Sequence, residues 1–331
     1  MKAWNSHEPK RSRISISANF SNQDSISPLK PVDASVRANS RLKEAQPALF
    51  PFSDYPVDAQ EGLHITTLEQ SANNWRNRHR PHRHDFYQIF WITRGKRSLT
   101  IDFDHFPVAA LSLVFVPPGA VHTFGTLEFT RGYMLSFQQD FLEAQGHSID
   151  LFQDCPAFDP AHFRAVLQVL PASEERVNSY FGQIFAEFNA KQQRHQTATA
   201  ALLRLLFVEI GRALISCGDS NSFQKYSPLT ARFLRRLNSR PYQIASASEV
   251  SKFLGVSRSW LNQLVRKETG KNLTHHLQAR LVLESKRLLA HSDLNISEIA
   301  YQLGFEDASY FTRLFKQIAR TSPREFRELH R

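Results

Sequence analysis

The stretch LGFEDASYFTRLFKQIARTSPREFR, from Leu303 to Arg327, lies near the end of this 331-residue chain and decides how its last third folds. Apolar residues recur in it at the spacing of one helix face, and basic residues are interleaved between them. A Leu-Gly step precedes this helix and a Ser-Pro step follows it. The stretch therefore predicts a sharp turn, a basic helix and the start of another helix.

The same pattern occurs earlier in the chain. One copy opens on Ser248-Glu and the other on Ser297-Glu, which we expect to cap a helix. Each short helix then ends at Leu-Gly, because glycine reaches the positive φ of a turn at little cost. Two copies of one pattern predict two helix-turn-helix units. Each copy also has a small residue four positions before its glycine, where two helices can cross closely: Ser251 and Ala300.

Net charge is concentrated in this part of the chain. The chain carries a formal net charge of +10. Residues 226–331 hold 18 Lys and Arg against 9 Asp and Glu, so they account for nearly all of it. Such an asymmetry is the electrostatic pattern expected of a protein that binds a polyanion, although a merely solubilising surface would also produce it.

Residues 226–331 resemble the AraC/XylS family of transcription regulators, most closely in IAYQLGFEDASYFTRLFKQIARTSPREFR. The chain departs from the family at Arg320, where members usually carry Gly, and at Ser251, where Ala is commoner. The resemblance implies an all-α domain with two helix-turn-helix units at 229–331 and sequence-specific binding to double-stranded promoter DNA. It also implies a cytoplasmic homodimer that works with RNA polymerase.

The resemblance places base contacts on the exposed face of the second helix of each unit. Asn and Gln can pair with adenine and Arg with guanine in the major groove, whereas flanking cations suit phosphates. A solvated charge is the alternative for some of the cations. The expected DNA-binding residues are Arg258, Ser259, Asn262, Gln263 and Arg266 in the first unit, and Ala308, Ser309, Thr312, Arg313 and Lys316 in the second.

A single helix is predicted between the two units. LTHHLQARLVLESKRLLA, from Leu273 to Ala290, would span about 27 Å at the helical rise of about 1.5 Å per residue. Successive major grooves on one face of DNA lie about 34 Å apart. With the width of the units added, a rigid helix of this length would seat them in adjacent grooves.

The first two thirds of the chain predict an α+β arrangement of a different kind. Residues 1–58 lack any sustained period and are expected to be a disordered tail. Short β-branched and aromatic runs in the N-terminal part of 59–218 predict a small antiparallel barrel or sandwich followed by helices. PHRHDFYQIFWI with PPGAVHTF resembles the cupin barrel, which implies the barrel. Residues 219–228 look like a linker. The helix containing Leu202–Ile210 is apolar on most sides, which predicts burial or packing on a second copy.

Four polar side chains stand out in the cupin-like part. His82, His84 and Gln88 share one strand parity, and His122 follows a Pro-x-Gly turn at the spacing of a third imidazole in metal cupins. Gln88 stands where such sites carry an acid, so we expect an effector pocket formed by all four residues, with no metal and no cofactor. A metal site and satisfied core histidines remain alternatives.

Composition excludes several other classes. No apolar run approaches the roughly 18 to 20 residues of a membrane-spanning helix, and the N-terminus lacks the apolar core of a signal peptide. The chain has only two cysteines, Cys155 and Cys217, which fit a reducing compartment. We therefore predict a transcription regulator, an activator rather than an enzyme, that responds to a small organic effector. PHRHDFYQIFWITRG resembles the sensing half of regulators of aromatic-acid catabolism, and this resemblance implies an aromatic acid as the effector. The alternatives are a metal-dependent cupin enzyme with a basic C-terminal module and a nonspecific architectural DNA-binding protein.

Overall fold

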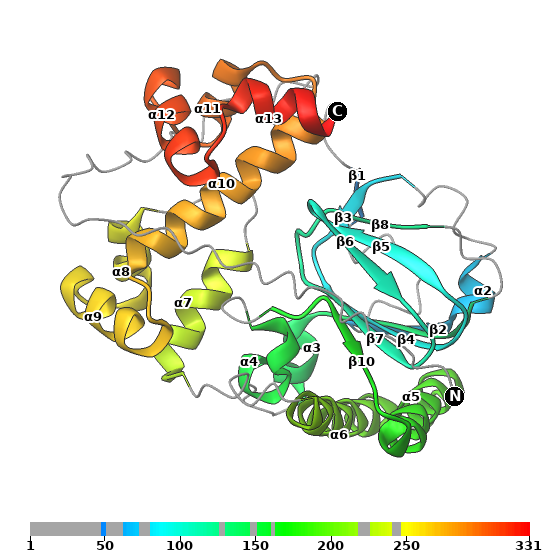
Figure 1. Cartoon of the computed structure of the whole chain (residues 1–331). Helices are drawn as coiled ribbons and strands as arrows, with labels where there is room; N and C mark the ends of the chain where they lie inside the picture. Colours follow the sequence, from blue (N-terminus) through cyan, green and yellow to red (C-terminus); the bar gives the residue numbers. More distant parts are fainter. Residues whose placement is uncertain are drawn as a thin grey trace, which may run out of the picture.

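The computed structural model describes residues 48–50, 62–72, 80–125, 130–145, 151–159, 163–217, 226–239 and 246–331. Its strands gather in the N-terminal part and its long helices in the rest of the chain (Figure 1). This division is the predicted α+β architecture: two facing sheets of a cupin-like barrel, followed by helices and then by an all-helical region.

Two five-stranded sheets form the barrel, and their strands pair antiparallel except for β1 with β3. The first sheet has the order β1 (Ala48–Phe50), β3 (His82–His84), β8 (His122–Phe124), β5 (Arg97–Ile101) and β6 (Asp104–Val108). The second has the order β10 (Val166–Gln168), β7 (Ser112–Val116), β4 (Tyr87–Arg94), β9 (Arg131–Phe137) and β2 (Leu63–Thr67), and helix α2 (Leu68–Ala72) follows β2.

Strand alternation divides the apolar residues of β4 between two cores. Phe90 and Ile92 belong to a cluster between the sheets, whereas Ile89 and Trp91 belong to a cluster on the outer face of the second sheet. Residues that share parity on a strand lie on the same side of the sheet, so both sides of this strand are buried. This explains why the apolar residues of DFYQIFWIT occur at both odd and even positions.

Helices α5 (Pro171–Ala190) and α6 (His195–Ser216) cover that outer face (Figure 1). Trp91 Nε1 donates a hydrogen bond to Asn178 Oδ1 on α5 at 3.2 Å, which ties the helix to the middle of the sheet. Shorter helical segments connect β9 to β10: α3 (Gln139–Ala144), α4 (Leu151–Asp154) and the 3₁₀ turn η3 (Pro156–Phe158).

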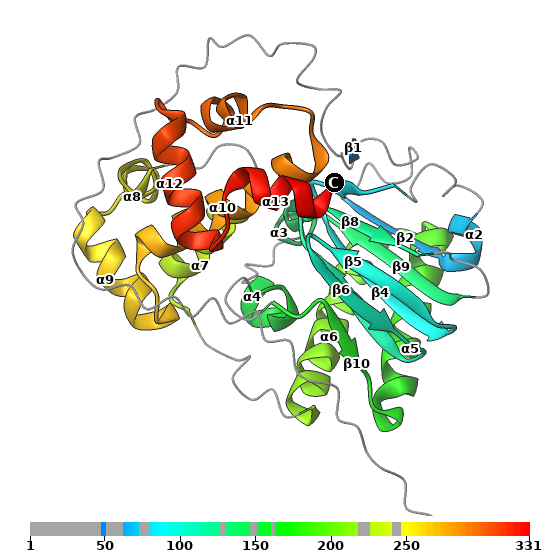
Figure 2. The same ribbon diagram turned by 45° about the horizontal axis from the view of Figure 1, so that its top comes forward.

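The C-terminal region consists of seven helices among its described residues. They are α7 (Pro228–Ser239), α8 (Ala247–Leu254), α9 (Arg258–Thr269), α10 (Leu273–His291), α11 (Ile296–Gln302), α12 (Ala308–Ala319) and α13 (Pro323–His330). Helix α10 runs between the pair α8–α9 and the pair α11–α12, and both views show it on the barrel side of α9 and α12 (Figures 1 and 2).

The two helical pairs are buried in different cores. Phe207 of α6, Phe233 of α7 and Leu261 of α9 belong to one continuous cluster that begins under the second sheet. Phe311 and Phe315 of α12 belong to a separate cluster. The first pair is therefore joined to the barrel region through a shared apolar core, and the second pair has a core of its own.

The structure describes parts of the expected tail and of the expected linker. Ala48–Phe50 form strand β1 and pair with β3, so the expectation of a disordered tail over 1–58 is wrong for these three residues, which gain a ladder partner. The rest of that tail lies outside the described residues. So does most of the expected linker 219–228, and α6 ends at Ser216 before it while α7 begins at Pro228.

Two features of composition can be placed in the fold. Across the described residues, no helix is both long enough and apolar enough to cross a membrane. Both cysteines are free, with Cys155 buried and Cys217 exposed.

Candidate DNA-reading helices and histidine cluster

Reciprocal capping boxes begin both helix-turn-helix units. Ser246 Oγ accepts from the Glu249 backbone N–H at 3.2 Å, and Glu249 Oε2 accepts from the Ser246 N–H at 2.6 Å. Asn295 and Glu298 form the same pair at 2.9 and 2.7 Å. The glutamate has to lie three residues after the cap for both bonds to form, which is why the caps precede the positions expected from the sequence. Those positions were Ser248 and Ser297, and both lie within the helices.

Each short helix ends at the predicted turn. Gly255 has φ of +73° and Gly304 has φ of +90°, the left-handed conformation that glycine tolerates best. Ser251 is buried with 4% of its surface exposed, and Ala300 is fully buried. The turn and the close helix crossing that the repeated pattern predicts are therefore both present.

Helices α9 and α12 bury one face and expose the other. Leu261 and Val265 of α9 are fully buried, as are Phe311 and Phe315 of α12. Of the ten expected DNA-binding residues, seven are exposed. The exposed residues are Arg258, Ser259, Gln263 and Arg266 on α9, and Ser309, Arg313 and Lys316 on α12.

Three of the expected DNA-binding residues are partly buried. The Asn262 carboxamide oxygen accepts a hydrogen bond from the Leu273 N–H at 3.1 Å, at the start of α10. The Thr312 hydroxyl donates to the Ala308 carbonyl at 2.9 Å. The Asn262 side chain is therefore partly buried and held toward α10. Gln263 is the better candidate for reading adenine on this helix.

Trp260 is a surface residue of α9 that the sequence reading did not include. Its ring is 50% exposed beside Ser259, on a helix whose apolar face is otherwise buried. An aromatic ring in this place can contact a thymine methyl group. Its position three residues before Gln263 could have identified it, because residues three apart lie on one helix face.

Helix α10 extends from Leu273 to His291, one residue beyond the predicted end. Its 19 residues span about 28 Å, so it can hold the two units at the separation of adjacent major grooves. The single-helix connection expected between the two reading helices is confirmed.

Three histidines meet on the first sheet. His82 of β3 and His122 of β8 are directly opposite in the antiparallel register, with ring centroids 4.3 Å apart. The ring of His84 lies 4.9 Å from that of His122 and stacks on Phe86 at 4.1 Å. All three imidazoles are buried, so the structure brings together the three histidines that the sequence singled out.

Gln88 belongs to the facing sheet. Its side chain is buried, and its Nε2 donates to Ser136 Oγ of β9 at 3.0 Å. Gln88 therefore faces the interior with the parity expected from the sequence, and its amide is already held by a neighbouring strand. No group of three or more His, Cys, Asp or Glu is arranged to hold a metal ion in the described part of the chain.

Arg97 is an interior cation that the sequence reading did not identify. It shares the inward parity of Leu99 and Ile101 on β5, and its guanidinium carbon lies 5.8 Å from the ring centroid of Phe124. Arg97 Nε donates to Thr130 Oγ1 at 2.7 Å. Burial lowers the pKa of this side chain to about 10, which still leaves it charged at neutral pH.

The interior around these polar groups is aromatic. Phe90 and Phe124 are in contact at a centroid distance of 4.5 Å, and Phe86 belongs to the same cluster. A ligand that replaced part of this packing would meet aromatic rings, imidazoles and a guanidinium. These groups suit a small molecule with an apolar body and a carboxylate.

Two family models match separate parts of the chain. A model described as an AraC-like ligand binding domain matches residues 65–208, which contain most of the barrel, helix α5 and most of α6. A model described as a helix-turn-helix domain matches residues 250–329, which contain α9 to α12 and parts of the flanking helices.

Curated relatives and solved structures are similar to this chain over different lengths. The HTH-type transcriptional activator RhaS of Escherichia fergusonii is 22% identical over 254 residues, which covers 75% of this chain and 87% of that protein. Among solved structures, fatty-acid-bound ToxT of Vibrio cholerae is 15% identical, covers 73% of this chain and 87% of that one, and has a TM-score of 0.31. The C-terminal domain of AraT from Geobacillus stearothermophilus is 27% identical over 32% of this chain and 88% of that one, with a TM-score of 0.30.

Proposed function

The chain belongs to the AraC family of transcription regulators, and from that premise we propose that it activates transcription from promoter DNA in the cytoplasm when a small organic acid binds its barrel. The observation that supports this most is the pair of exposed reading helices joined by the single helix α10. In this proposal residues 59–218 sense the effector and residues 229–331 read the DNA. RNA polymerase is the expected partner at the promoter.

Selection from random-sequence DNA tests the reading function. The full chain should enrich a site with two recognition segments about one helical turn apart, since α10 sets the separation of α9 and α12. Binding to that site should exceed binding to unrelated DNA by at least about a thousandfold at physiological salt. Equal binding to all sequences would mean a nonspecific DNA-binding protein and would contradict the proposal.

The proposed effector is a carboxylic acid with an aromatic body, held by Arg97 and the three histidines. The cationic guanidinium beside Phe124 supports this class, because it offers a carboxylate a charge-assisted hydrogen bond next to a ring surface. Calorimetry of the full chain against benzoates and phenylacetates tests it, with an unsaturated fatty acid as the comparison for an aliphatic body. His84→Ala should abolish both the heat of binding and the transcriptional response.

Metal analysis separates this proposal from the enzyme alternative. A metal-dependent cupin enzyme would purify with stoichiometric iron, manganese or zinc, and chelators would destabilise it. We expect the purified chain to contain no stoichiometric metal and its melting temperature to be unchanged by EDTA.

A homodimer through α6 completes the proposal. The exposed residues Ala201, Leu205, Val208, Arg212 and Ile215 recur at alternating spacings of four and three along this helix. That is the spacing of a coiled-coil seam, and three of its members are large apolar residues about half exposed in the single chain. A second copy of α6 would bury them.

A further inference from the structure

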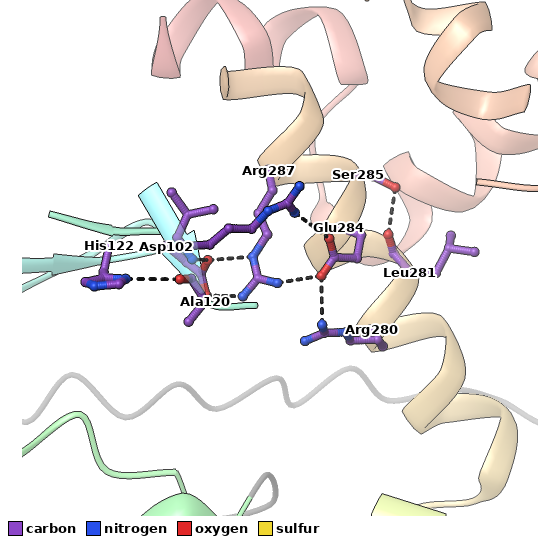
Figure 3. A network of polar contacts seen from close by, with 10 residues as sticks. Asp102, Ala120, His122, Arg280, Leu281, Glu284, Ser285 and Arg287 are labelled. Atoms are coloured by element: carbon purple, nitrogen blue, oxygen red, sulfur yellow. Dashed lines mark hydrogen bonds and ion pairs between the residues drawn. The ribbon is translucent and has the colours of Figure 1, made fainter. Parts of the chain in front are cut away.

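A polar junction connects the barrel to helix α10. Asp102 lies in the turn between β5 and β6, and both of its carboxylate oxygens accept hydrogen bonds from Arg287 of α10, at 2.6 and 2.8 Å (Figure 3). Arg287 also donates to Glu284 one turn earlier. Arg287 and Glu284 are buried, so this ion pair is shielded from solvent on the α10 side.

The same carboxylate is bonded to the strand that carries His122. Asp102 Oδ1 accepts from the Val121 backbone N–H at 3.2 Å, and the Asp102 N–H donates to the Val121 carbonyl at 2.7 Å. The next residue is His122, whose Nδ1 lies 3.2 Å from the Ala120 carbonyl. His122 is thus one residue away from the backbone groups that hold Asp102, so a shift of His122 along its strand would carry them with it.

A second histidine strand reaches the same helix. Arg83 stands between His82 and His84 on β3, and alternation directs it to the opposite side from the imidazoles. Its NH1 lies 3.9 Å from Glu284 Oε2, and Arg280 lies 2.9 Å from Glu284 Oε1. Arg83 therefore connects the strand that carries His82 and His84 to α10.

Electrostatics make this junction sensitive to small displacements. Burial alone would lower the pKa of Arg287, but the carboxylates of Asp102 and Glu284 raise it above its ordinary value. Burial lowers the pKa of Arg83 to about 10, and the nearby Glu284 opposes that effect. Charges held in this way are stable only while their partners stay in place, because an unpaired buried charge is strongly destabilising.

An apolar contact reinforces the junction on the second unit. Phe103, next to Asp102, packs edge-on against Phe326 of α13 at a centroid distance of 5.1 Å and against His330 at the same distance. The second helix-turn-helix unit is therefore joined to the barrel by the β5–β6 turn, whereas the first is joined through the core under α6 and α7.

We propose that Asp102, Arg287, Glu284 and Arg83, here called the latch, transmit the state of the histidine cluster to helix α10 and so set the position of the second reading helix. This inference rests on the proposed function for its biological purpose, but the coupling itself is a property of the chain. The latched form leaves Arg313 and Ser309 exposed, and α12 lies across α10 and α13 from the barrel (Figure 2). The latch thus orients the second helix-turn-helix unit and leaves the exposed face of α12 uncovered.

Single-molecule energy transfer on the full chain tests the latch without any ligand or DNA. One dye is attached to Cys217, which is exposed at the end of α6, and the other to a Leu329→Cys side chain on α13, where the native leucine is 76% exposed. Cys155 is buried, and burial raises the pKa of its thiol, so it stays unlabelled. Picomolar concentrations keep the chain monomeric, so every distance lies within one molecule.

Asp102→Asn removes one charge and keeps the size of the side chain. We expect the ratio of undocked to docked molecules to rise roughly tenfold or more, because Arg287 loses its charged partner across the junction. Asp104→Asn is the matched control: Asp104 is exposed at the start of β6, and its charge also attracts Lys286 of α10, but Arg287 bonds to Asp102 and not to it. This variant therefore measures the effect of one lost charge at the junction while the latch contacts are kept. Arg287→Lys, which keeps the charge and loses the two-point contact, replaces the first variant if Asp102→Asn does not fold.

Coupling to the histidines has its own readout. In the native chain, His122→Leu should raise the ratio of undocked to docked molecules. In a chain that already carries Asp102→Asn it should raise that ratio no further, because both changes act through the same contact. An Asp102→Asn ratio equal to that of Asp104→Asn, or a His122→Leu effect that is absent or fully additive, would overturn the latch. Failure to select a DNA site would instead count against the proposed function, and the docking result would stand.

Discussion

At the scale of single residues, Arg320 introduces backbone strain at the end of the second helix-turn-helix unit. It ends α12 with φ of +62°, in the left-handed region, and the matching residue after α9 is Gly270 with φ of +72°. Arg320 is also one of the two positions where the chain departs from its family, so the usual glycine has a physical reason here. Arg320→Gly should stabilise the chain by about 0.5 to 1 kcal/mol in denaturant unfolding.

Gly270 provides the reciprocal test. A Cβ at Gly270 would meet nothing within 4 Å, so Gly270→Ala carries only the conformational cost. That variant should lose about the amount that Arg320→Gly gains. If both variants lowered stability, the arginine side chain rather than its backbone conformation would dominate at this position.

His276 makes the stability of the fold depend on pH. Burial, together with the neighbouring His275, lowers the pKa of His276 to about 4 from the ordinary 6.5, so the folded state holds it neutral. The unfolded chain takes up the proton as pH falls below 6.5, and the folded chain does so only near 4. The contribution of His276 to stability is therefore fully present above 6.5 and is lost as pH falls to about 4.

The loss should reach about 2 kcal/mol, less than the full shift implies because solvent screens a partly exposed ring. Urea unfolding of the native chain and of His276→Gln at pH 7 and pH 4.5 measures it. The native chain should lose more stability than the variant over this range. Equal losses would mean that other groups, such as His275, account for the acid sensitivity.

The sequence identified site residues whose direction is fixed by their near neighbours in the chain. It missed residues whose role depends on a partner farther along the chain. The three histidines were found because strand parity and a turn motif fix their directions. The role of Asn262 was not foreseen, because its acceptor contact is to the start of the next helix, eleven residues away. Arg97 shares the parity of its apolar neighbours, but a cation inside a barrel runs against composition rules.

At the scale of elements, α12 carries a reading prediction. Arg313 is exposed on the face opposite Phe311 and Phe315, so it can reach a guanine edge. Arg313→Ala should cost about 1 to 3 kcal/mol on the selected site and relax preference at one base pair. Lys316→Ala on the same helix should weaken binding to all sequences alike, since a phosphate contact carries no base information. A uniform loss for Arg313→Ala would assign it to the phosphates as well.

Helix α6 carries the prediction about assembly. Leu205→Arg places a charge on a half-exposed seam position, so the fold should tolerate it while self-association is lost. Sedimentation at tens of micromolar should show a dimer for the native chain and a monomer for the variant. Leu329→Arg, a matched change on α13, should remain dimeric. A native monomer under these conditions, with and without DNA, would remove the dimer from the proposal.

Periodicity predicted the long elements well and their ends less well. The helix α10 was expected over 273–290, and the structure ends it one residue later. The caps of α8 and α11 lie two residues before the Ser-Glu steps, since a capping box is defined by side-chain geometry and not by composition. Strand β1 escaped notice because three residues carry too little periodicity to distinguish them from a tail.

At the scale of the whole molecule, the sequence alone could not predict how the C-terminal helical region packs on the barrel. Asp102 and Arg287 are 185 residues apart, and each reads locally as an ordinary surface charge. Phe103 lies in a turn where an exposed aromatic residue needs no special explanation. Only the fold shows that these two neighbours contact α10 and α13.

The arrangement of cores and latch leads to a prediction about operator spacing. In a dimer joined through α6, the first reading helix is fixed to the seam by a shared core, and the latch fixes the second through α10. Both reading helices of both protomers then have defined positions. The two half-sites of the operator must therefore lie at the correct helical phase relative to each other. Inserting about 5 base pairs, half a helical turn, should lower the affinity of the native chain by more than tenfold.

Asp102→Asn should bind the unaltered operator somewhat more weakly than the native chain does and should tolerate the insertion better, because its second head can reorient. The discriminating quantity is the ratio of the two affinities, measured for the native chain, for Asp102→Asn and for the Asp104→Asn control. A ratio nearer to one for Asp102→Asn alone supports a latch that fixes the reader. If the insertion penalises all three proteins equally, the second head is oriented by α10 itself, and the contact with the barrel has another role.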